Sequence, residues 1–223
     1  MSDKQKILST LKASSVVAVI RVDDPGDLVD VSKALYAGGV KFIEITMTVP
    51  GALTVIEKAV NSLRNEDVYI GAGTVLDGET ARLAILAGAS YVVSPAYMAD
   101  VVNTCKRYGV VVMPGALTPT EIINAWEAGA DVVKIFPGDI GGPNYIKAIR
   151  EPFPQVELLP TKGIDFNTAA AFIKAGAIAV GTGSALVNKT MMANKEYQKI
   201  TENARRFTNL IRQAKEGNIE CSK

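Results

Sequence analysis

The chain has 223 residues, of which 48% are hydrophobic and 21% are charged, and its formal net charge is +1. This composition is typical of an ordinary globular protein, and it lacks the basic excess that would favour binding to nucleic acid or to an anionic membrane surface. No apolar run approaches the roughly 20 residues that a membrane-spanning helix requires. Because the polar start of the chain leads into no apolar segment of the signal-peptide kind, we expect a cytoplasmic protein.

Two residue types restrict the chemistry further. The chain contains no histidine, which excludes Ser-His-Asp and Cys-His catalysis and removes the commonest protein ligand of zinc. The two cysteines, Cys105 and Cys221, indicate neither a disulfide framework nor a zinc site. We expect Cys105 to be a small core residue in a helix and Cys221 to lie in an exposed tail. Acid–base work then falls to Lys, Glu, Asp, Tyr or water.

The predicted elements alternate along the chain. Eight apolar runs of strand length are separated by helix-length segments in which apolar residues recur at i, i+3 and i+4, for example Ile122, Ile123 and Trp126. The runs span residues 16–21, 41–46, 68–72, 90–94, 110–114, 131–136, 156–160 and 178–181. Eight such units are the number that closes a (β/α)8 barrel, so we expect an α/β fold with a single TIM-barrel domain over residues 1–223.

The two ends of the chain lie outside this alternation. We expect a short amphipathic helix over residues 1–14. A longer final helix is expected over residues 195–215, with Ile200, Ala204, Phe207 and Ile211 on its apolar face. The polar tail, residues 217–223, is expected to be frayed.

Start and stop signals support the helices. Thr118 and Glu121, with Pro119 between them, are predicted to form a capping box, and Asp77 and Asp165 are predicted N-caps. Glycine just past a helix supplies the left-handed residue that often ends it. Four predicted helices end in this way, in the segments 37–39, 87–89, 128–130 and 175–177.

A lysine stands within the sixth apolar run, Asp131-Val-Val-Lys-Ile-Phe-Pro137. A run that is apolar on both faces is typical of a central parallel strand. Burial of an ammonium group is costly, and a lowered pKa that leaves the amine of Lys134 neutral is the usual relief. A neutral amine in a dry pocket forms Schiff bases with ketones and aldehydes. The alternative is that Lys134 pairs with a carboxylate or reaches water and does no chemistry.

A glutamate stands in the same way within the second run, Phe42-Ile-Glu-Ile-Thr46. In a barrel the active residues lie at the carboxyl ends of the strands, so we expect Glu44 and Lys134 at one mouth. The lysine would form the iminium, and the glutamate, through a water, would carry protons. The alternative is a structural role for Glu44 as partner of Lys41 or Arg21.

The last two strand ends indicate a phosphate site. Residues 161–163 and 181–184 offer glycines for close approach, hydroxyl groups and one cation, Lys162. In barrels the loops after strands seven and eight often bind phosphate through backbone N–H groups at a short helix.

These motifs, at consistent spacing from about residue 16 to residue 187, together match a known family. They are Val19-Ile-Arg21, Ile43-Glu-Ile-Thr46, Gly71-Ala-Gly-Thr-Val75, Val93-Ser-Pro95, Met113-Pro-Gly115, Thr118-Pro-Thr-Glu121, Val133-Lys-Ile-Phe-Pro137, Leu159-Pro-Thr161 and Gly183-Ser184. The chain resembles class I aldolases of the 2-keto-3-deoxy-6-phosphogluconate (KDPG) and 4-hydroxy-2-oxoglutarate (KHG) type. The resemblance implies cleavage of one or both keto acids to pyruvate and an aldehyde, glyceraldehyde 3-phosphate or glyoxylate.

The resemblance also implies a compact (β/α)8 barrel, usually a homotrimer, that needs no metal or organic cofactor and binds a small keto acid. It implies that Lys134 is the Schiff-base lysine and Glu44 the general acid and base. Arg21 would lie near the reacting centre and the phosphorylated end, and Thr74 would hold the pyruvyl carboxylate. The other substrate-binding residues that it implies are Pro95, Thr161, Lys162, Gly163, Gly183 and Ser184.

Two positions depart from the family pattern. Thr48 stands where many members carry an arginine that contacts the pyruvyl carboxylate, so binding would rely on hydroxyls, backbone amides and Arg21. Lys162 replaces a usual glycine, where it would add a charge for an anionic group or obstruct the backbone cradle. Two other functions stay open: a phosphate-sugar epimerase or isomerase with Glu44 as base and Lys134 merely electrostatic, and a non-catalytic oligomeric barrel.

Overall fold

The computed structural model describes residues 3–217, and within them the strands form two sheets in which every pairing is parallel. The larger sheet has the order β5-β4-β3-β2-β1-β9 and the smaller one the order β6-β7-β8. The strands are β1 (Val16–Ile20), β2 (Phe42–Thr46), β3 (Tyr69–Gly73), β4 (Tyr91–Val93), β5 (Val111–Met113), β6 (Gly115–Ala116), β7 (Val133–Ile135), β8 (Leu158–Pro160) and β9 (Val180–Thr182). Each of the eight predicted runs overlaps a strand, and β3 and β9 each extend one residue beyond the predicted end.

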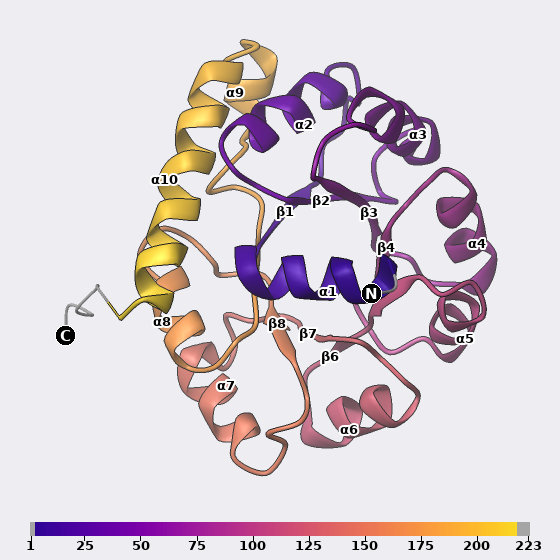
Figure 1. The fold of residues 1–223 in the computed structure, drawn as a ribbon, viewed down its shortest axis with the longest axis vertical. Coiled ribbons are helices and arrows are strands. Elements are labelled where there is room, and N and C mark those ends of the chain that lie inside the picture. Colours follow the sequence, from indigo (N-terminus) through magenta and orange to yellow (C-terminus); the bar gives the residue numbers. More distant parts are fainter. Residues whose placement is uncertain (1–2, 218–223) are drawn as a thin grey trace.

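The two sheets approach one another at both of their edges. Only Pro114 separates β5 from β6, and the amide of Asp131 donates to the carbonyl of Val112 at 3.1 Å. At the other edge, the amide of Ile178 donates to Leu158 at 3.0 Å, and Thr161 forms a parallel bridge with Gly181. The result is a curled parallel sheet around the middle of the molecule (Figure 1). The short strand β6 was not predicted, because proline at position 114 removes a donor and interrupts the ladder.

Helices lie outside the curled sheet, and one helix lies across its middle (Figure 1). The helices are α1 (Asp3–Ser14), α2 (Leu28–Ala37), α3 (Ala52–Ser62), α4 (Gly78–Leu86), α5 (Ala99–Arg107), α6 (Pro119–Glu127), α7 (Gly142–Arg150), α8 (Ala169–Lys174), α9 (Lys189–Ala193) and α10 (Tyr197–Lys215). The long helix α10 packs on α2 and α8, and α1 crosses the open middle of the ring of strands. In this part of the chain no helix is long and apolar enough to cross a membrane.

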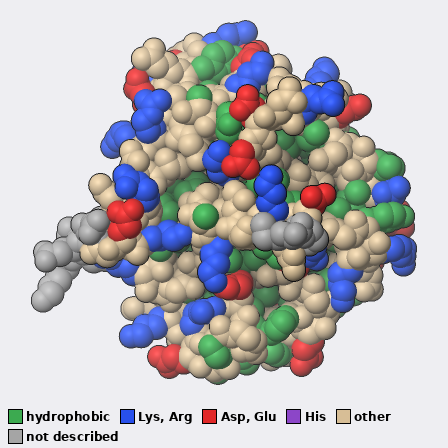
Figure 2. Space-filling view, in the orientation of Figure 1, with side chains coloured by type: hydrophobic (Ala, Val, Ile, Leu, Met, Phe, Trp, Pro, Cys, Tyr) green, Lys and Arg blue, Asp and Glu red, His purple; other side chains and the backbone are tan. Residues whose placement is uncertain are grey.

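The strands separate two apolar clusters, because successive side chains of a strand point to opposite faces. The inner cluster contains Leu11 of α1 with Val17, Phe42 and Tyr91 from the strands. The outer cluster lies between the strands and the surrounding helices and contains alternate residues such as Val133. Helix α1 thus covers the amino ends of the strands. On this face basic and acidic side chains are interspersed (Figure 2), as expected from the net charge of +1.

Most boundary signals are confirmed. Thr118 and Glu121 form the capping box at α6, and Asp77 accepts a hydrogen bond from the amide of Thr80 at 2.6 Å as N-cap of α4. The four glycines just past predicted helices have φ between 94° and 101°: Gly39, Gly88, Gly129 and Gly176. Ile200, Ala204, Phe207 and Ile211 of α10 are buried, as is Cys105. Cys221 and the predicted tail beyond residue 217 lie outside the described residues.

One prediction about the helices was wrong. Asp165 is not an N-cap, because α8 begins only at Ala169; its carboxylate instead accepts from the amides of Asn167 and Thr168 in the preceding turn. Trp126, one of the apolar residues that recur along α6, is 36% exposed. The buried residues of α6 are Ile122 and Ala125, so Trp126 lies at the edge of the buried face.

Candidate active site

The predicted lysine lies at the centre of the structure. Lys134 is in the middle of β7, and only 4% of it is exposed. Its neighbours Val133 and Ile135 belong to the outer cluster, so alternation along the strand directs Lys134 inward. Its Nζ stands 5.0 Å from the ring centroid of Phe136, and no ion pair involving it occurs in residues 3–217. Lys134 is therefore a buried amine without a carboxylate at ion-pair distance.

The predicted glutamate is buried as well. Glu44 is 1% exposed, and within the described chain its Oε1 has no hydrogen-bond partner. Burial raises the pKa of Glu44, while the charges of Lys134 and Arg21 act in the opposite direction. These three side chains therefore interact electrostatically. Lys41, the other partner considered for Glu44, pairs instead with Asp67 at 3.3 Å.

Two glycines near the acid and the amine have no room for a side chain. A Cβ atom on Gly73 of β3 would overlap the carboxyl group of Glu44, so glycine is the residue that lets the carboxylate lie over this strand. A Cβ atom on Gly115, the β6 residue that pairs with Lys134, would overlap the carbonyl oxygen of Pro95. This contact places Pro95 beside the strand next to the lysine.

Arg21 connects the first and third strand ends. Its guanidinium donates to the hydroxyl of Thr74 at 3.3 Å. Thr74 has a φ of 57°, a left-handed conformation that is unusual for a residue other than glycine and that holds the loop after β3 in a defined shape. Thr48, at the position of the family's arginine, is exposed, and its hydroxyl is 2.8 Å from that of Thr46.

A cavity of about 650 Å³ opens at the carboxyl ends of β1, β8 and β9. Six of the predicted binding residues line it: Arg21, Thr161, Lys162, Gly163, Gly183 and Ser184. Phe136, which follows β7 and lies against Lys134, lines it too. Thr74, Pro95, Glu44 and Lys134 do not line the cavity itself. Arg21, which lines the cavity, donates a hydrogen bond to Thr74. Phe136, which also lines it, lies against Lys134.

The loop after β8 carries the unusual lysine. Lys162 has a φ of 77° and lies 3.7 Å from the carboxylate of Asp139, with both side chains largely exposed. Next to it Gly163, with a φ of 74°, is packed so closely on Asp139 that a side chain would not fit. In this loop the backbone of Gly163 therefore still packs closely on Asp139, and Lys162 adds a positive charge at the cavity.

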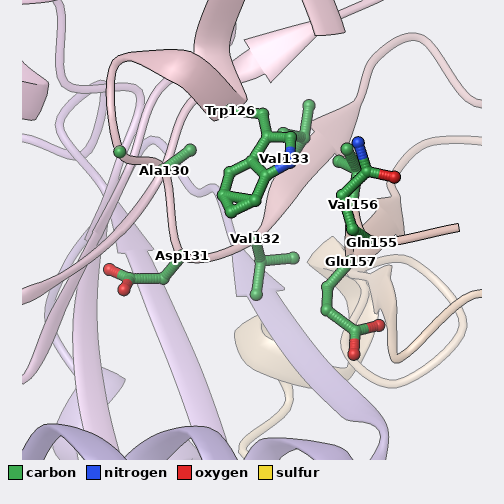
Figure 3. A pocket seen from close by; sticks show the side chains of 9 residues that line it. Trp126, Ala130, Asp131, Val132, Val133, Gln155, Val156 and Glu157 are labelled. Atoms are coloured by element: carbon green, nitrogen blue, oxygen red, sulfur yellow. The ribbon is translucent and has the colours of Figure 1, made fainter. Parts of the chain in front are cut away.

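A second hollow, of about 340 Å³, lies at the amino ends of β7 and β8 (Figure 3). Its two carboxylates already have partners: Asp131 pairs with Lys4 at 2.9 Å, and Glu157 with Lys12 at 3.5 Å. Trp126 forms one wall of this hollow. Neither Lys134 nor Glu44 reaches it, so it is separate from the candidate site.

Sequence reasoning missed several residues at the site. Asn188 and Lys189 line the cavity, although they lie beyond the last motif. Tyr91 lies inside the ring of strands with an unpartnered hydroxyl. An aromatic residue at the start of a strand is typical of a core position, so no signal in the sequence marked it. Among residues 3–217, no three side chains of the His, Cys, Asp or Glu type gather as metal ligands would.

The family model described as KDPG and KHG aldolase matches residues 7–203. The chain belongs to the KDPG and KHG aldolase family. It is 34% identical over 198 residues to the 2-dehydro-3-deoxy-phosphogluconate aldolase of Treponema pallidum, covering 87% of this chain and 92% of that protein. It is 30% identical to the KHG/KDPG aldolase of Escherichia coli K12, covering 88% of this chain and 92% of that protein. This family member is accordingly an aldolase, and aldolases are lyases.

Solved structures of the family have the same fold as this aldolase. The KDPG aldolase of Zymomonas mobilis ZM4 with 3-phosphoglycerate has a TM-score of 0.83 at 28% identity, covering 93% of this chain and 97% of that one. The KDPG aldolase of Legionella pneumophila, with pyruvate captured as a covalent carbinolamine intermediate, has a TM-score of 0.80 at 28% identity, covering 92% and 97%.

Proposed function

We propose that this aldolase cleaves KDPG, KHG or both to pyruvate and an aldehyde, glyceraldehyde 3-phosphate or glyoxylate, through a Schiff base at Lys134. The observation that carries the proposal is the buried pair of Lys134 and Glu44, an amine and an acid that interact electrostatically inside one ring of strands. A carbinolamine with pyruvate in the Legionella relative supports the same class of chemistry.

The amine of Lys134 attacks the C2 ketone, and loss of water from the carbinolamine gives a protonated iminium. A base removes the proton of the C4 hydroxyl. The electrons of the C3–C4 bond then move to C3 and form an enamine, while C4 leaves as the aldehyde. Protonation of the enamine at C3 and hydrolysis of the resulting iminium release pyruvate and free Lys134. Atoms balance without an external oxidant or cofactor.

Glu44 is the acid and base of this sequence. Its position inside the strands, without a fixed hydrogen-bond partner, leaves its carboxyl group available to the substrate or to a bound water. Burial raises the pKa of Glu44, which makes its carboxylate a stronger base than that of an exposed glutamate. The same residue therefore removes the hydroxyl proton and returns a proton to the enamine.

The two ends of the substrate lie at different strand ends. Thr74 and Arg21, joined by a hydrogen bond, would hold the pyruvyl carboxylate, with Pro95 beside the lysine. The distal end would extend into the cavity. There Thr161, Gly163, Gly183 and Ser184 offer hydroxyls and close backbone approach, and Lys162 adds a charge for phosphate.

The proposal includes the architecture of the family. The hydrogen bonds and the bridge between the two sheets support a closed (β/α)8 barrel as one domain over the whole chain, with α1 covering its amino end. We also propose a homotrimer in the cytoplasm. A relative of the same fold, with a TM-score of 0.84, occurs in a protein cage designed by fusing symmetric oligomeric domains, which supports oligomer formation in this fold.

Trapping with borohydride tests the mechanism. Wild type, Lys134→Ala and Lys162→Ala would be incubated with pyruvate and borohydride and digested, and adducts located by mass spectrometry. Reduction of the iminium should leave a pyruvyl-derived mass on Lys134 in the wild type and in Lys162→Ala, and none in Lys134→Ala. A coupled assay of pyruvate release from KDPG and from KHG gives the substrate. Proton exchange without cleavage would indicate the epimerase alternative, and an unlabelled Lys134 would refute the Schiff base.

A further inference from the structure

Two of the buried polar atoms that lack partners belong to the strands on either side of β3. Tyr91, the first residue of β4, is fully buried, and its hydroxyl makes no hydrogen bond within the described chain. The same is true of Oε1 of Glu44 on β2. An unsatisfied buried polar group destabilises the folded state. Two such groups on either side of one strand point to a partner that they share.

The register of the strands brings the two residues together. Gly71 of β3 pairs with Glu44 of β2 on one side and with Tyr91 of β4 on the other. A Cβ atom on Gly71 would overlap the Tyr91 ring at Cζ, the atom that carries the hydroxyl. A Cβ atom on Gly73 would overlap the Glu44 carboxyl group. The hydroxyl end of the tyrosine and the carboxyl group thus lie over two glycines of the same strand.

The spacing of these glycines fits one bridging molecule. Gly71 and Gly73 are alternate residues of β3, and a strand rises about 3.3 Å per residue, so their inner faces lie about 6.6 Å apart. Neither oxygen is within hydrogen-bond distance of the other. A single water between them would satisfy one lone pair or proton on each, and two polar partners are the minimum that a buried water needs.

The tyrosine is the donor of this pair. Burial, and after it the charge of Glu44, raises the pKa of Tyr91 well above its usual value, so the hydroxyl keeps its proton throughout the working range of an enzyme. A donor directed at a carboxyl group favours the ionised form. It would oppose the effect of burial, which favours the protonated form of Glu44.

We propose that Tyr91 is a positioning residue for the catalytic acid: its hydroxyl donates through one buried water to the carboxyl group of Glu44, fixing the direction of that group and helping it to ionise. The inference rests on the proposed role of Glu44. In this arrangement Tyr91 acts on Glu44 through the water and not on the substrate.

The chain offers a matched control. Tyr69 and Tyr91 both pack on Phe42, with ring centroids 5.0 Å and 5.6 Å from it. Tyr91→Phe and Tyr69→Phe each remove one hydroxyl and keep the ring, so that packing is preserved in both. Only the first removes the donor that faces Glu44.

The test compares wild type and both variants in two ways. The first is the pH profile of kcat and of KM. The second is the titration of the Glu44 carboxyl carbon by NMR in 13C-glutamate-labelled enzyme without substrate, with the signal assigned through Glu44→Gln. In Tyr91→Phe we expect the acid limb and the NMR midpoint to move up by about one pH unit, since loss of a donor to the ionised carboxyl group favours its protonated form. KM should change less than about twofold, and Tyr69→Phe should overlay the wild type.

Either of two results would overturn the inference. One is an unchanged Glu44 titration in Tyr91→Phe; the other is an equal shift in both tyrosine variants, which would reflect a general effect of packing. Because the NMR titration uses no substrate, it reads the link between Tyr91 and Glu44 even if Lys134 forms no adduct. Failure of the proposed reaction and failure of this inference are therefore distinguishable.

Discussion

The carboxyl group of Glu44 occupies the space that a side chain on Gly73 would fill. The two residues belong to neighbouring strands, Glu44 standing two residues before Thr46, the register partner of Gly73, and glycine is the only residue type that leaves this space free. The position of the Glu44 carboxyl group thus depends on the absence of a side chain at Gly73 of β3.

Gly73→Ala should therefore inactivate the enzyme by moving Glu44. A displacement of about 1 Å from a reactive position can cost about 100-fold in rate, and we expect a loss of kcat of that order. Stability should fall by about 1–3 kcal/mol from overpacking. Steady-state kinetics and urea unfolding measure the two effects. Gly26→Ala, whose Cβ atom would meet Asp24 at 3.3 Å in a surface loop, is the control. Wild-type kcat in Gly73→Ala would contradict the assignment.

Removing the charge of Glu44 should stabilise the fold at high pH. Burial raises the pKa of Glu44 in the folded state, so the folded chain binds this proton more tightly than the unfolded chain. The resulting stability is complete below the ordinary glutamate pKa of about 4.3 and is lost as pH rises through the raised value. Glu44→Gln cannot ionise, so its melting temperature should exceed that of wild type by about 2–4 °C or more at pH 8 and approach it near pH 4.

Melting curves from pH 4 to pH 9 measure this difference. The exposed Glu57 on α3 supplies the control, Glu57→Gln, which should follow the wild type at every pH. If Glu44→Gln were no more stable than wild type at pH 8, the expectation that burial raises the pKa of Glu44 would be wrong.

Lys162 should contribute to binding of the phosphorylated substrate at a cost in stability. Its left-handed backbone costs a residue other than glycine about 1–2 kcal/mol, and its exposed pair with Asp139 returns about 0–1 kcal/mol. We expect Lys162→Gly to be slightly more stable than wild type in urea. Its KM for KDPG should rise about fivefold, equivalent to about 1 kcal/mol, while its KM for KHG stays constant. Asparagine adopts the same left-handed backbone, so Lys162→Asn removes the charge and keeps the conformation. Equal KM changes for both substrates would exclude a phosphate contact.

Thr48→Arg should strengthen binding of the pyruvyl end. Thr48 is exposed at the loop after β2, and its hydroxyl contacts only Thr46 in the interactions of the described chain. A guanidinium there would reach a carboxylate that otherwise depends on Arg21 and Thr74. A charge-assisted hydrogen bond of about 1.5 kcal/mol lowers KM about tenfold. Kinetics with KHG and KDPG check this value, and Thr48→Met supplies the added length without the charge. A KM equal to that of Thr48→Met would show that the carboxylate lies elsewhere.

Thr118→Ala should destabilise the fold without changing the chemistry. Its hydroxyl accepts from the amide of Glu121 at 3.3 Å in the capping box of α6, and loss of an N-cap costs about 1 kcal/mol. Thr120, exposed on the same helix, provides Thr120→Ala as reference. Urea unfolding should separate the two variants, with kcat equal in both. Because alanine is the better helix former, Thr120→Ala should not lose stability, and an equal loss in both variants would contradict the capping role of Thr118.

The sequence by itself determined the features that depend on neighbours along the chain. The eight strands, the capping box at Thr118, the helix-ending glycines and the burial of Lys134 follow from side-chain alternation and turn chemistry, which act over a few residues. The motif set also placed the chain in its family. The inward direction of Glu44 follows from the same alternation once the strand is assigned.

The tertiary structure decided what depends on register and on the approach of distant segments. It showed that Asp165 does not stand at the start of α8, and that Arg21 forms a hydrogen bond with Thr74 across 53 residues. It showed that six predicted binding residues share one cavity while Lys134 and Glu44 lie beside it. Only the pairing of β2, β3 and β4 brings Tyr91 and Glu44 to opposite sides of Gly71. Strand register is set by the packing of the whole sheet, so no local sequence pattern encodes which side chains meet across a glycine.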